Sequence, residues 1–380
     1  MKTIAIVGLG TMGHGLAQVY AAAGFKVLAT DAHAPARDSA SDRLATALAP
    51  RVATGKLSPE ARDATLANLT IVESLQALAP ATLVIEAIVE KLTAKQALVA
   101  ELEQVVASTA ILATNTSSLS VNAIAAGAKH PERILGLHFF NPAPVMKLVE
   151  LVPHAHTTAQ ALTEARRITE VAGKTVIQCS DSPGFIVNRC ARPFYGEALA
   201  MLDEGRSASD IDAAMLTAGY RLGPFQLIDL IGADINLAAT EVLFAAMSEN
   251  PRYYPFEPLR RQVAFGRLGR KSGAGFLFPS EPGPTPTDAS EIVLRIESTL
   301  VNEAAWLLSE GGISANDIDT AITLGLNFPR GPFEMLKAYG IDTIRSELKK
   351  LEAKTLLNGR YILAQTLRPE CRHLDRAKKI

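Results

Sequence analysis

Residues 2–31 read KTIAIVGLGTMGHGLAQVYAAAGFKVLATD. The apolar run Lys2–Val7 is typical of a buried strand, and the glycine-rich turn GLGTMG at 8–13 leads into a helical stretch that Gly24 ends. A second apolar strand, Lys26–Thr30, closes on an acid, Asp31. A strand, a G-x-G-x-x-G turn, a helix and a strand in this order indicate the first unit of a doubly wound parallel sheet.

The same turn predicts a dinucleotide site. The first glycine permits the tight turn, the second lets a pyrophosphate approach the backbone, and the third lets helix and strand pack closely. The start of the helix offers free N–H groups to the phosphates. A carboxylate at Asp31 accepts hydrogen bonds from ribose hydroxyls and repels a 2′-phosphate, so NAD is favoured over NADP, although Arg37 lies near. The candidate cofactor residues here are Gly8, Gly10, Thr11, Met12, Gly13 and Asp31.

The alternation of strands and helices continues to about residue 180, which predicts a large, mostly parallel sheet. Helices are expected over 92–107 and 121–126. From Asp181 to about Tyr361 the pattern is helical instead. The fold class is therefore α/β: a Rossmann-type domain over 1–180, a helical domain over 181–280 and a second helical copy over 288–380. The further strands are expected at Leu69–Val72, Thr82–Glu86, Ile111–Asn115, Ile134–Phe140, Leu148–Val152 and Thr175–Gln178.

Composition is typical of a cytoplasmic enzyme. The chain has 380 residues, 48% of them hydrophobic and 20% charged, and a formal net charge of −1. It has no charge excess to hold nucleic acid, no apolar run long enough to span a membrane and no signal peptide before the first strand. Its three cysteines, Cys179, Cys190 and Cys371, are scattered, so neither a disulfide framework nor a metal site is expected.

One histidine and one carboxylate stand out in residues 136–152, GLHFFNPAPVMKLVELV. His138 and Glu150 lie in two apolar runs joined by Asn141-Pro142-Ala143-Pro144, which cannot continue either strand. Two strands joined in this way can bring the two side chains together away from water. A carboxylate on one imidazole nitrogen fixes the tautomer, so the other nitrogen can take a proton. A single histidine in an apolar run is more often a satisfied core residue, but the dinucleotide site favours a catalytic pair.

Polar residues also follow the predicted strands, where ligands of doubly wound sheets bind. Glu90 follows the strand over 82–86, and Asn115 and Ser117 follow the strand that begins at Ile111. Ser117 has an alternative role as the N-cap of the next helix.

The helical half contains an internal repeat. Three groups of residues recur with nearly constant spacing, and the prolines at 279, 282, 284 and 286 between the copies indicate a linker. At the offset of 106, Asn188 of the first copy corresponds to Leu294 of the second, although their neighbours match. We therefore expect the first copy to line a site and the second to be structural. The first group, Glu197-Ala198, Leu202 and Glu204-Gly205, recurs as Glu303-Ala304, Leu308 and Glu310-Gly311. The second, Asp210-Ile211-Asp212, recurs as Asp317-Ile318-Asp319. The third, Gly223-Pro224-Phe225, recurs as Gly331-Pro332-Phe333.

Taken together, the motifs resemble the L-3-hydroxyacyl-CoA dehydrogenases. The resemblance covers residues 1–278, and the duplicated helical unit resembles the two-copy members found in fatty-acid oxidation and aromatic-acid breakdown. In single-copy members this domain makes the dimer, so the resemblance implies either a monomer with an internal pseudo-dimer or a homodimer. The motifs are GLGTMG (8–13), VIEAIVE (84–90), NTSSLS (115–120), GLHFFNPAPVMKLVELV (136–152), DSPGFIVNR (181–189), GPFQLIDLIGAD (223–234) and GRLGRKSGAGF (266–276).

The resemblance implies a reaction and a set of roles. The reaction is the reversible, NAD-dependent oxidation of an (S)-3-hydroxyacyl-CoA to the 3-oxoacyl-CoA. His138 is the implied acid/base and Glu150 its orienting carboxylate, and Ser117 and Asn188 are implied to hydrogen-bond the substrate near its C3 oxygen. The residues implied to lie around the cofactor, besides those of the turn, are Glu90, Lys95, Asn115, Ser117, Asn141 and Lys271.

One segment departs from the family pattern. Single-copy enzymes hold coenzyme A with a helix rich in serine and lysine after the second strand, but Asp38–Gly55 contains no lysine. The candidate residues for the coenzyme A nucleotide are therefore Arg43, Arg51 and Lys56. Two other functions remain open, a sugar-acid dehydrogenase and a crystallin-like protein without catalysis, because both resemble this family in the nucleotide domain.

Overall fold

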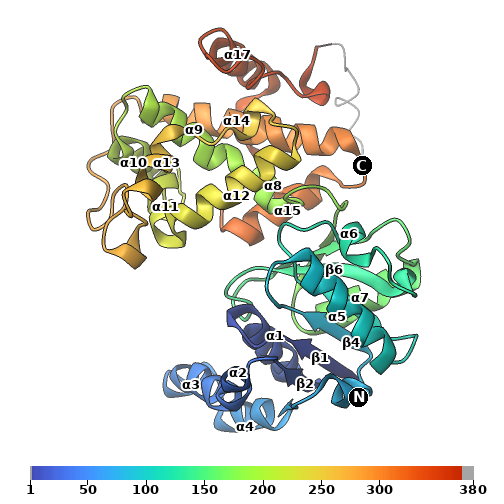
Figure 1. The fold of residues 1–380 in the computed structure, drawn as a ribbon. Coiled ribbons are helices and arrows are strands. Elements are labelled where there is room, and N and C mark those ends of the chain that lie inside the picture. Colours follow the sequence, from blue (N-terminus) through green and yellow to red (C-terminus); the bar gives the residue numbers. More distant parts are fainter. Residues whose placement is uncertain (1, 370–380) are drawn as a thin grey trace. The chain divides into compact units, whose positions relative to one another are not determined.

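The computed structural model describes residues 2–369, so Cys371 and the end of the predicted second helical copy lie outside the described residues. The chain divides into two compact units between Phe185 and Ile186. The first contains all the strands of the described chain, and the second is helical (Figure 1). The two predicted helical copies lie together in this second unit.

The first unit is built on one eight-stranded sheet with the order β3-β2-β1-β4-β5-β6-β7-β8. All neighbouring strands are parallel except β6 and β7, which are antiparallel. The predicted α/β class and its mostly parallel sheet are thus confirmed. The strands are β1 (Thr3–Val7), β2 (Lys26–Thr30), β3 (Leu69–Ile71), β4 (Leu83–Glu86), β5 (Ile111–Thr114), β6 (Ile134–Phe139), β7 (Leu148–Val152) and β8 (Thr175–Gln178).

Helices cover both faces of this sheet, which is why its strands are apolar on both sides. Along β1, Ile4 and Ile6 join one hydrophobic cluster, together with Leu16 of α1. Ala5 joins the other, together with Leu98 of α5, because side chains alternate between the faces of a strand. The helices of this unit are α1 (Thr11–Ala22), α2 (Ala34–Asp38), α3 (Ala40–Ala53), α4 (Pro59–Ala67), α5 (Leu92–Val105), α6 (Val121–Ala125) and α7 (Ala159–Val171).

The second unit centres on α14, a helix of 22 residues that packs against helices of both copies. The linker over 279–288 is irregular, as its prolines predict. The helices are α8 (Val187–Cys190), α9 (Arg192–Asp203), α10 (Ala208–Thr217), α11 (Pro224–Ile231), α12 (Ala233–Ala246), α13 (Glu257–Ala264), α14 (Ala289–Glu310), α15 (Ala315–Leu326), α16 (Pro332–Tyr339) and α17 (Ile341–Glu352).

The repeat is visible in equivalent helix starts. The carboxylate of Asp212 accepts from the backbone N–H groups of Phe225 and Gln226 at the start of α11. Asp319 does the same at the start of α16, with Phe333 and Glu334. A β-carbon at Gly223 or Gly331 would lie 2.2 or 2.3 Å from the respective aspartate, which explains the glycine in both copies.

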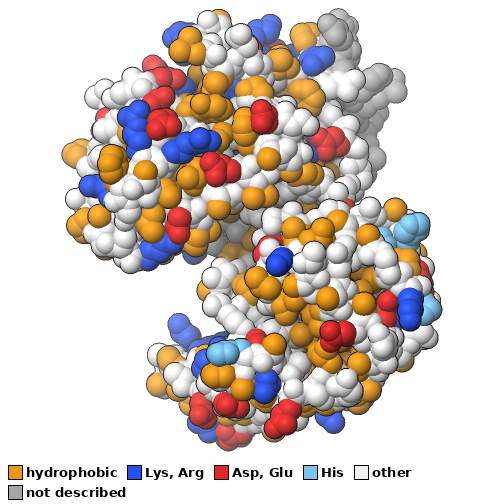
Figure 2. Space-filling model, in the orientation of Figure 1, with side chains coloured by type: hydrophobic (Ala, Val, Ile, Leu, Met, Phe, Trp, Pro, Cys, Tyr) orange, Lys and Arg blue, Asp and Glu red, His pale blue; other side chains and the backbone are white. Residues whose placement is uncertain are grey.

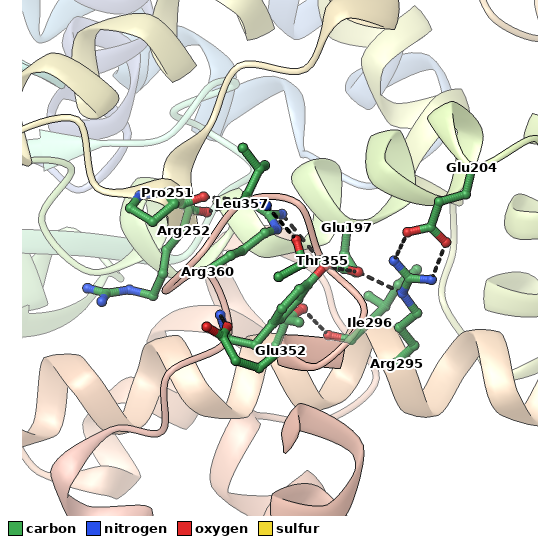
Figure 3. Close-up of polar contacts among 12 residues, drawn as sticks. Glu197, Glu204, Pro251, Arg252, Arg295, Ile296, Glu352, Thr355, Leu357 and Arg360 are labelled. Atoms are coloured by element: carbon green, nitrogen blue, oxygen red, sulfur yellow. Dashed lines mark hydrogen bonds and ion pairs between the residues drawn. The ribbon is translucent and has the colours of Figure 1, made fainter. Parts of the chain in front are cut away.

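Reciprocal ion pairs join the two copies. Arg189 of the first copy donates from Nε to Glu303 at 2.8 Å and from both terminal nitrogens to Glu310 at 2.6 and 2.7 Å. Arg295, its equivalent in the second copy, makes the same contacts in return (Figure 3), with Glu197 at 2.7 Å and Glu204 at 2.6 and 2.7 Å. Contacts that are exchanged in this way are the signature of two-fold association, here within one chain.

A second reciprocal set surrounds the two buried glutamates. Glu303 also accepts from the Tyr253 hydroxyl at 2.5 Å and from Arg252 at 2.9 Å. Glu197 accepts from Arg360 at 3.3 Å (Figure 3). It also accepts from Tyr361 at 2.8 Å. These two residues stand 108 positions after Arg252 and Tyr253. A buried carboxylate is tolerated only when it is paired and hydrogen-bonded, and each of these has two arginines and a tyrosine.

On the face shown in Figure 2, side chains of both charge signs are interspersed in each unit, in keeping with the net charge of −1. Among residues 2–369 no helix combines the length and the apolar character that crossing a bilayer requires.

Candidate active site

The glycine-rich turn between β1 and α1 has the geometry that its motif predicts. Gly8 has a φ of +97°, and a β-carbon there would lie 2.6 Å from the carbonyl oxygen of Ala87. A β-carbon at Gly13 would lie 1.7 Å from the carbonyl oxygen of Gly8, so helix and strand need this glycine to pack. Gly10 is different: it is exposed, and no heavy atom of the protein lies within 4 Å of its would-be β-carbon. The open space at Gly10, at the start of α1, fits the approach of a pyrophosphate.

These differences predict opposite phenotypes for two alanine variants. We expect Gly10→Ala to fold with a parent-like Tm but to bind NADH roughly 10- to 100-fold more weakly, because a methyl group would occupy the phosphate site. Gly13→Ala should instead lower the Tm or prevent folding, because its methyl group would overlap the Gly8 carbonyl. Thermal melting and NADH titration of both variants check this, and parent-like NADH affinity in Gly10→Ala would contradict the assignment.

The acid at the end of β2 is tied to the same turn. Asp31 accepts from the backbone N–H of Leu9 at 2.6 Å and from that of His33 at 2.8 Å. Arg43 donates to the carbonyl oxygen of Leu9 at 2.9 Å and to the carbonyl oxygen of Ala36 at 3.0 Å. Arg43, predicted from its position to hold coenzyme A, therefore holds the nucleotide turn. Arg37 donates to the carbonyl oxygens of Asp31 and Ala32, at 2.5 and 3.3 Å.

A buried charge cluster follows β4. Lys95 of α5 is 1% exposed, and its ammonium lies 2.8 Å from Glu86 and 3.3 Å from Glu90. Glu90 also accepts from the hydroxyl of Thr116 at 2.5 Å and from the backbone N–H of Ser117 at 3.0 Å. Burial opposes the ionisation of Glu90, but the Thr116 hydroxyl and the charge of Lys95 outweigh it and lower its pKa. Lys95 thus meets Glu86 and Glu90 and does not itself reach the surface, a partnership that the sequence pattern missed.

Hydrogen bonds also order the segment that follows β5. The side-chain oxygen of Asn115 accepts from the backbone N–H of Phe139 at 2.9 Å, which ties the end of β5 to the end of β6. The alternative role for Ser117 is wrong, because α6 is capped by Ser120, whose hydroxyl accepts from the N–H of Ala123. Ser117 itself is exposed, and its backbone N–H is bound to Glu90.

His138 and Glu150 face each other across the antiparallel strands β6 and β7, as predicted. Their Nδ1 and Oε2 atoms lie 2.6 Å apart, and the side chains are 6% and 0% exposed. The rings of Phe140 and Phe185 flank the imidazole, with centroids at 4.5 and 5.8 Å. Because Nδ1 meets the carboxylate, Nε2 is the nitrogen that can exchange a proton with a ligand. Burial, aided by the charge of Glu150, raises the pKa of the nearby Cys179 thiol, which therefore stays protonated.

The other predicted residues are not brought together within one unit. Asn141 is exposed in the turn between β6 and β7, and Arg51 and Lys56 are exposed at the end of α3 and just beyond it. Asn188 lies in α8 of the second unit. Lys271, also in the second unit, contacts Asp234 at 2.7 Å. Among residues 2–369, His, Cys, Asp and Glu side chains form no group of three that could hold a metal ion.

Comparisons with known proteins agree with this geometry. The family model of the 3-hydroxyacyl-CoA dehydrogenase NAD-binding domain matches residues 3–182. The model of the 3-hydroxyacyl-CoA dehydrogenase C-terminal domain matches residues 184–278 and again residues 292–369, which are the two copies of the repeat.

Named relatives point the same way. A 3-hydroxyadipyl-CoA dehydrogenase of Escherichia coli K12 is 47% identical over 277 residues, which are 72% of this chain but only 58% of that protein. The crystal structure of a 3-hydroxybutyryl-CoA dehydrogenase, also from Escherichia coli K12, is 34% identical with a TM-score of 0.91 and covers 100% of this chain and 99% of its own. An (S)-3-hydroxybutyryl-CoA dehydrogenase of Ralstonia eutropha is 36% identical with a TM-score of 0.70, over 73% of this chain and 98% of its own.

Proposed function

The chain belongs to the 3-hydroxyacyl-CoA dehydrogenase family, and on that premise we propose that it oxidises an (S)-3-hydroxyacyl-CoA thioester to the 3-oxoacyl-CoA with NAD. The observation that carries the proposal is the buried pair of His138 and Glu150, joined at 2.6 Å across β6 and β7. A histidine with a purely structural role would not need a buried carboxylate of its own.

In the proposed reaction, Nε2 of His138 removes the proton of the C3 hydroxyl. Glu150 accepts the hydrogen bond from Nδ1 throughout and stabilises the imidazolium that forms. In the reverse direction the imidazolium returns the proton to the ketone oxygen. Ser117, exposed beyond β5, and Asn188, at the start of the first helical copy, are the proposed hydrogen-bond partners of the C3 oxygen.

The residues present fit NAD. The N–H groups at the start of α1, the open space at Gly10 and the carboxylate of Asp31 offer sites for the pyrophosphate and the ribose. NAD, when bound, accepts the hydride from C3. The chain contributes by orienting both ligands, by holding the turn through Asp31 and Arg43, and by handling the proton at His138.

An assay of NADH oxidation with acetoacetyl-CoA, beside an identical assay with free acetoacetate, tests the proposal. We expect turnover with the thioester and none with the free acid. Turnover of free hydroxy acids alone would favour the sugar-acid dehydrogenase, and tight NADH binding without any turnover would favour the crystallin-like alternative. A crystallin-like protein would not need the buried pair of His138 and Glu150, so the presence of this pair favours the enzyme.

Three further points are part of the proposal. Arg51 and Lys56, both exposed, remain candidates for the coenzyme A nucleotide, whereas the contacts of Arg43 favour a role at the NAD site.

The reciprocal ion pairs between the helical copies support a monomer that carries its own internal pseudo-dimer. Cys179 and Cys190, both buried and neither in a disulfide, support a cytoplasmic location.

A further inference from the structure

One buried arginine of the first helical copy has no acid to pair with. Arg192, at the start of α9, is 8% exposed, and no carboxylate of the described residues pairs with it. Burial lowers the pKa of its guanidinium, whereas the equally buried Arg189 has two glutamates. A buried charge without a counter-charge destabilises a fold, because burial removes its hydration and nothing replaces it. Such a group is retained where a ligand supplies the missing charge.

The neighbours of Arg192 are polar but neutral. Its Nη1 donates to the hydroxyl of Thr240 at 3.0 Å and to the carbonyl oxygen of Asn236 at 3.4 Å, and its Nε donates to the carbonyl oxygen of Asn188 at 3.2 Å. The ring of Tyr195 lies 4.9 Å from the guanidinium carbon. Within the described chain, Nη2 has no hydrogen-bond partner. Two donor hydrogens therefore remain for an anion.

Asn236 of α12 has unused capacity as well. It is 3% exposed, and its side-chain oxygen is buried without a partner. Because the two ends of an amide can exchange by rotation, this group can also present its NH2 to an anion beside Arg192. The cavity that adjoins Arg192 and Thr240 measures about 10 Å³, the volume of one water molecule, so a carboxylate binds there only when the neighbouring side chains move apart.

The second copy shows that the fold itself does not need this polar cluster. At the offset of 106, Ser298 stands in place of Arg192, and at the offset of 108, Ile344 and Leu348 stand in place of Asn236 and Thr240. Ile344 and Leu348 are both 0% exposed, so aliphatic packing satisfies these positions in the same helical architecture. The charged cluster occurs only in the copy that carries Asn188.

We propose that Arg192, with Asn236 and Thr240, binds the distal carboxylate of a 3-hydroxydicarboxylyl-CoA substrate. This inference rests on the proposed function, in which Asn188 meets the C3 oxygen. Ala191 continues the helical conformation from α8 into α9, so Asn188 and Arg192 lie one turn apart on the same face. That spacing, about 5–6 Å between β-carbons, is the reach of a short alkyl chain from C3. The guanidinium also keeps its positive charge at neutral pH, and the two hydrogens of its Nη2 can donate to a carboxylate.

The test compares two thioesters of equal chain length, 3-hydroxyadipyl-CoA and 3-hydroxyhexanoyl-CoA, which differ only in a terminal carboxylate or methyl group. We expect the parent protein to prefer the adipyl thioester at least about 10-fold in kcat/KM. In Arg192→Leu the ratio of the two kcat/KM values should fall about 100-fold, and Arg192→Lys should lose less, because it keeps the positive charge that attracts the carboxylate. Ser298→Ala, at the equivalent position of the second copy, is the matched control and should leave the ratio unchanged.

The outcomes separate this inference from the proposed function. No turnover of either thioester by the parent protein would overturn the function itself. Turnover of both without a preference for the carboxylate, or an equal loss of both in Arg192→Leu, would overturn the inference alone; the equal loss would assign Arg192 to coenzyme A or to the fold. If Arg192→Leu does not fold, competitive inhibition of the parent by adipyl-CoA against hexanoyl-CoA decides, and equal inhibition constants would contradict the inference.

Discussion

Replacement of His138 by alanine is expected to lower kcat by about 10³- to 10⁴-fold while NADH still binds. In the proposed function the imidazole takes the C3 proton, because its Nδ1 is bound to Glu150 and its Nε2 is left for the substrate. The glycine-rich turn and Asp31, which we propose to hold the nucleotide, make contacts separate from this pair. The variant should therefore separate binding from chemistry.

NADH titration, thermal melting and steady-state turnover of the same preparation check this expectation. His138→Gln serves as a second variant, because its amide can replace one hydrogen bond but cannot accept a proton at neutral pH. If either variant retained turnover within a few-fold of the parent, the assignment of the base would be wrong. A large loss of Tm in both would instead point to a structural role.

The second large effect is expected for Glu150→Gln, with a loss of kcat of about 10²- to 10⁴-fold. The amide has no charge to stabilise an imidazolium, and its NH2 can turn the imidazole to the wrong tautomer. Glu150 is fully buried, but the substitution conserves its volume, so the fold should survive.

Glu103→Gln is the matched control for this variant. Glu103 accepts from the backbone N–H groups of Lys129 and His130 and takes no part in the proposed chemistry. It should therefore leave kcat and the pH profile at the parent values. A parent-like rate and pH profile in Glu150→Gln would remove the orienting role.

The sequence could predict the His138–Glu150 pair because both residues lie in strands joined by a short connection. Antiparallel pairing around such a connection leaves few registers, and the apolar alternation selects among them. The first unit of the sheet was equally accessible, since the spacing of Gly8, Gly10 and Gly13 reports backbone constraints that only glycine meets.

The roles of Arg43 and Lys95 could not be predicted, because they depend on side chains that meet across the sheet layers. Arg43 follows β2 on a surface helix, where a solvent-facing role is the default expectation, yet it reaches the carbonyl of Leu9. Lys95 lies on the buried face of α5, where it pairs with Glu86 and Glu90. The periodicity of the sequence does not reveal such a pairing. The burial of Arg192 without a counter-charge was not predictable for the same reason, because it depends on which side chains surround it in the folded protein.

The reciprocal ion pairs of Arg189 and Arg295 bear on how far the two helical copies can differ in sequence. In a dimer of two identical chains every substitution appears twice. A residue that serves a ligand site in one subunit must therefore also be tolerated at the same position of the other subunit. Here a tether fixes the two halves at a high effective concentration, and their pairing does not weaken on dilution. Each half can then vary independently: the first carries Asn188 and Arg192, and the second has Leu294 and Ser298 at the equivalent positions. The two copies thus differ at these positions although their reciprocal ion pairs are the same.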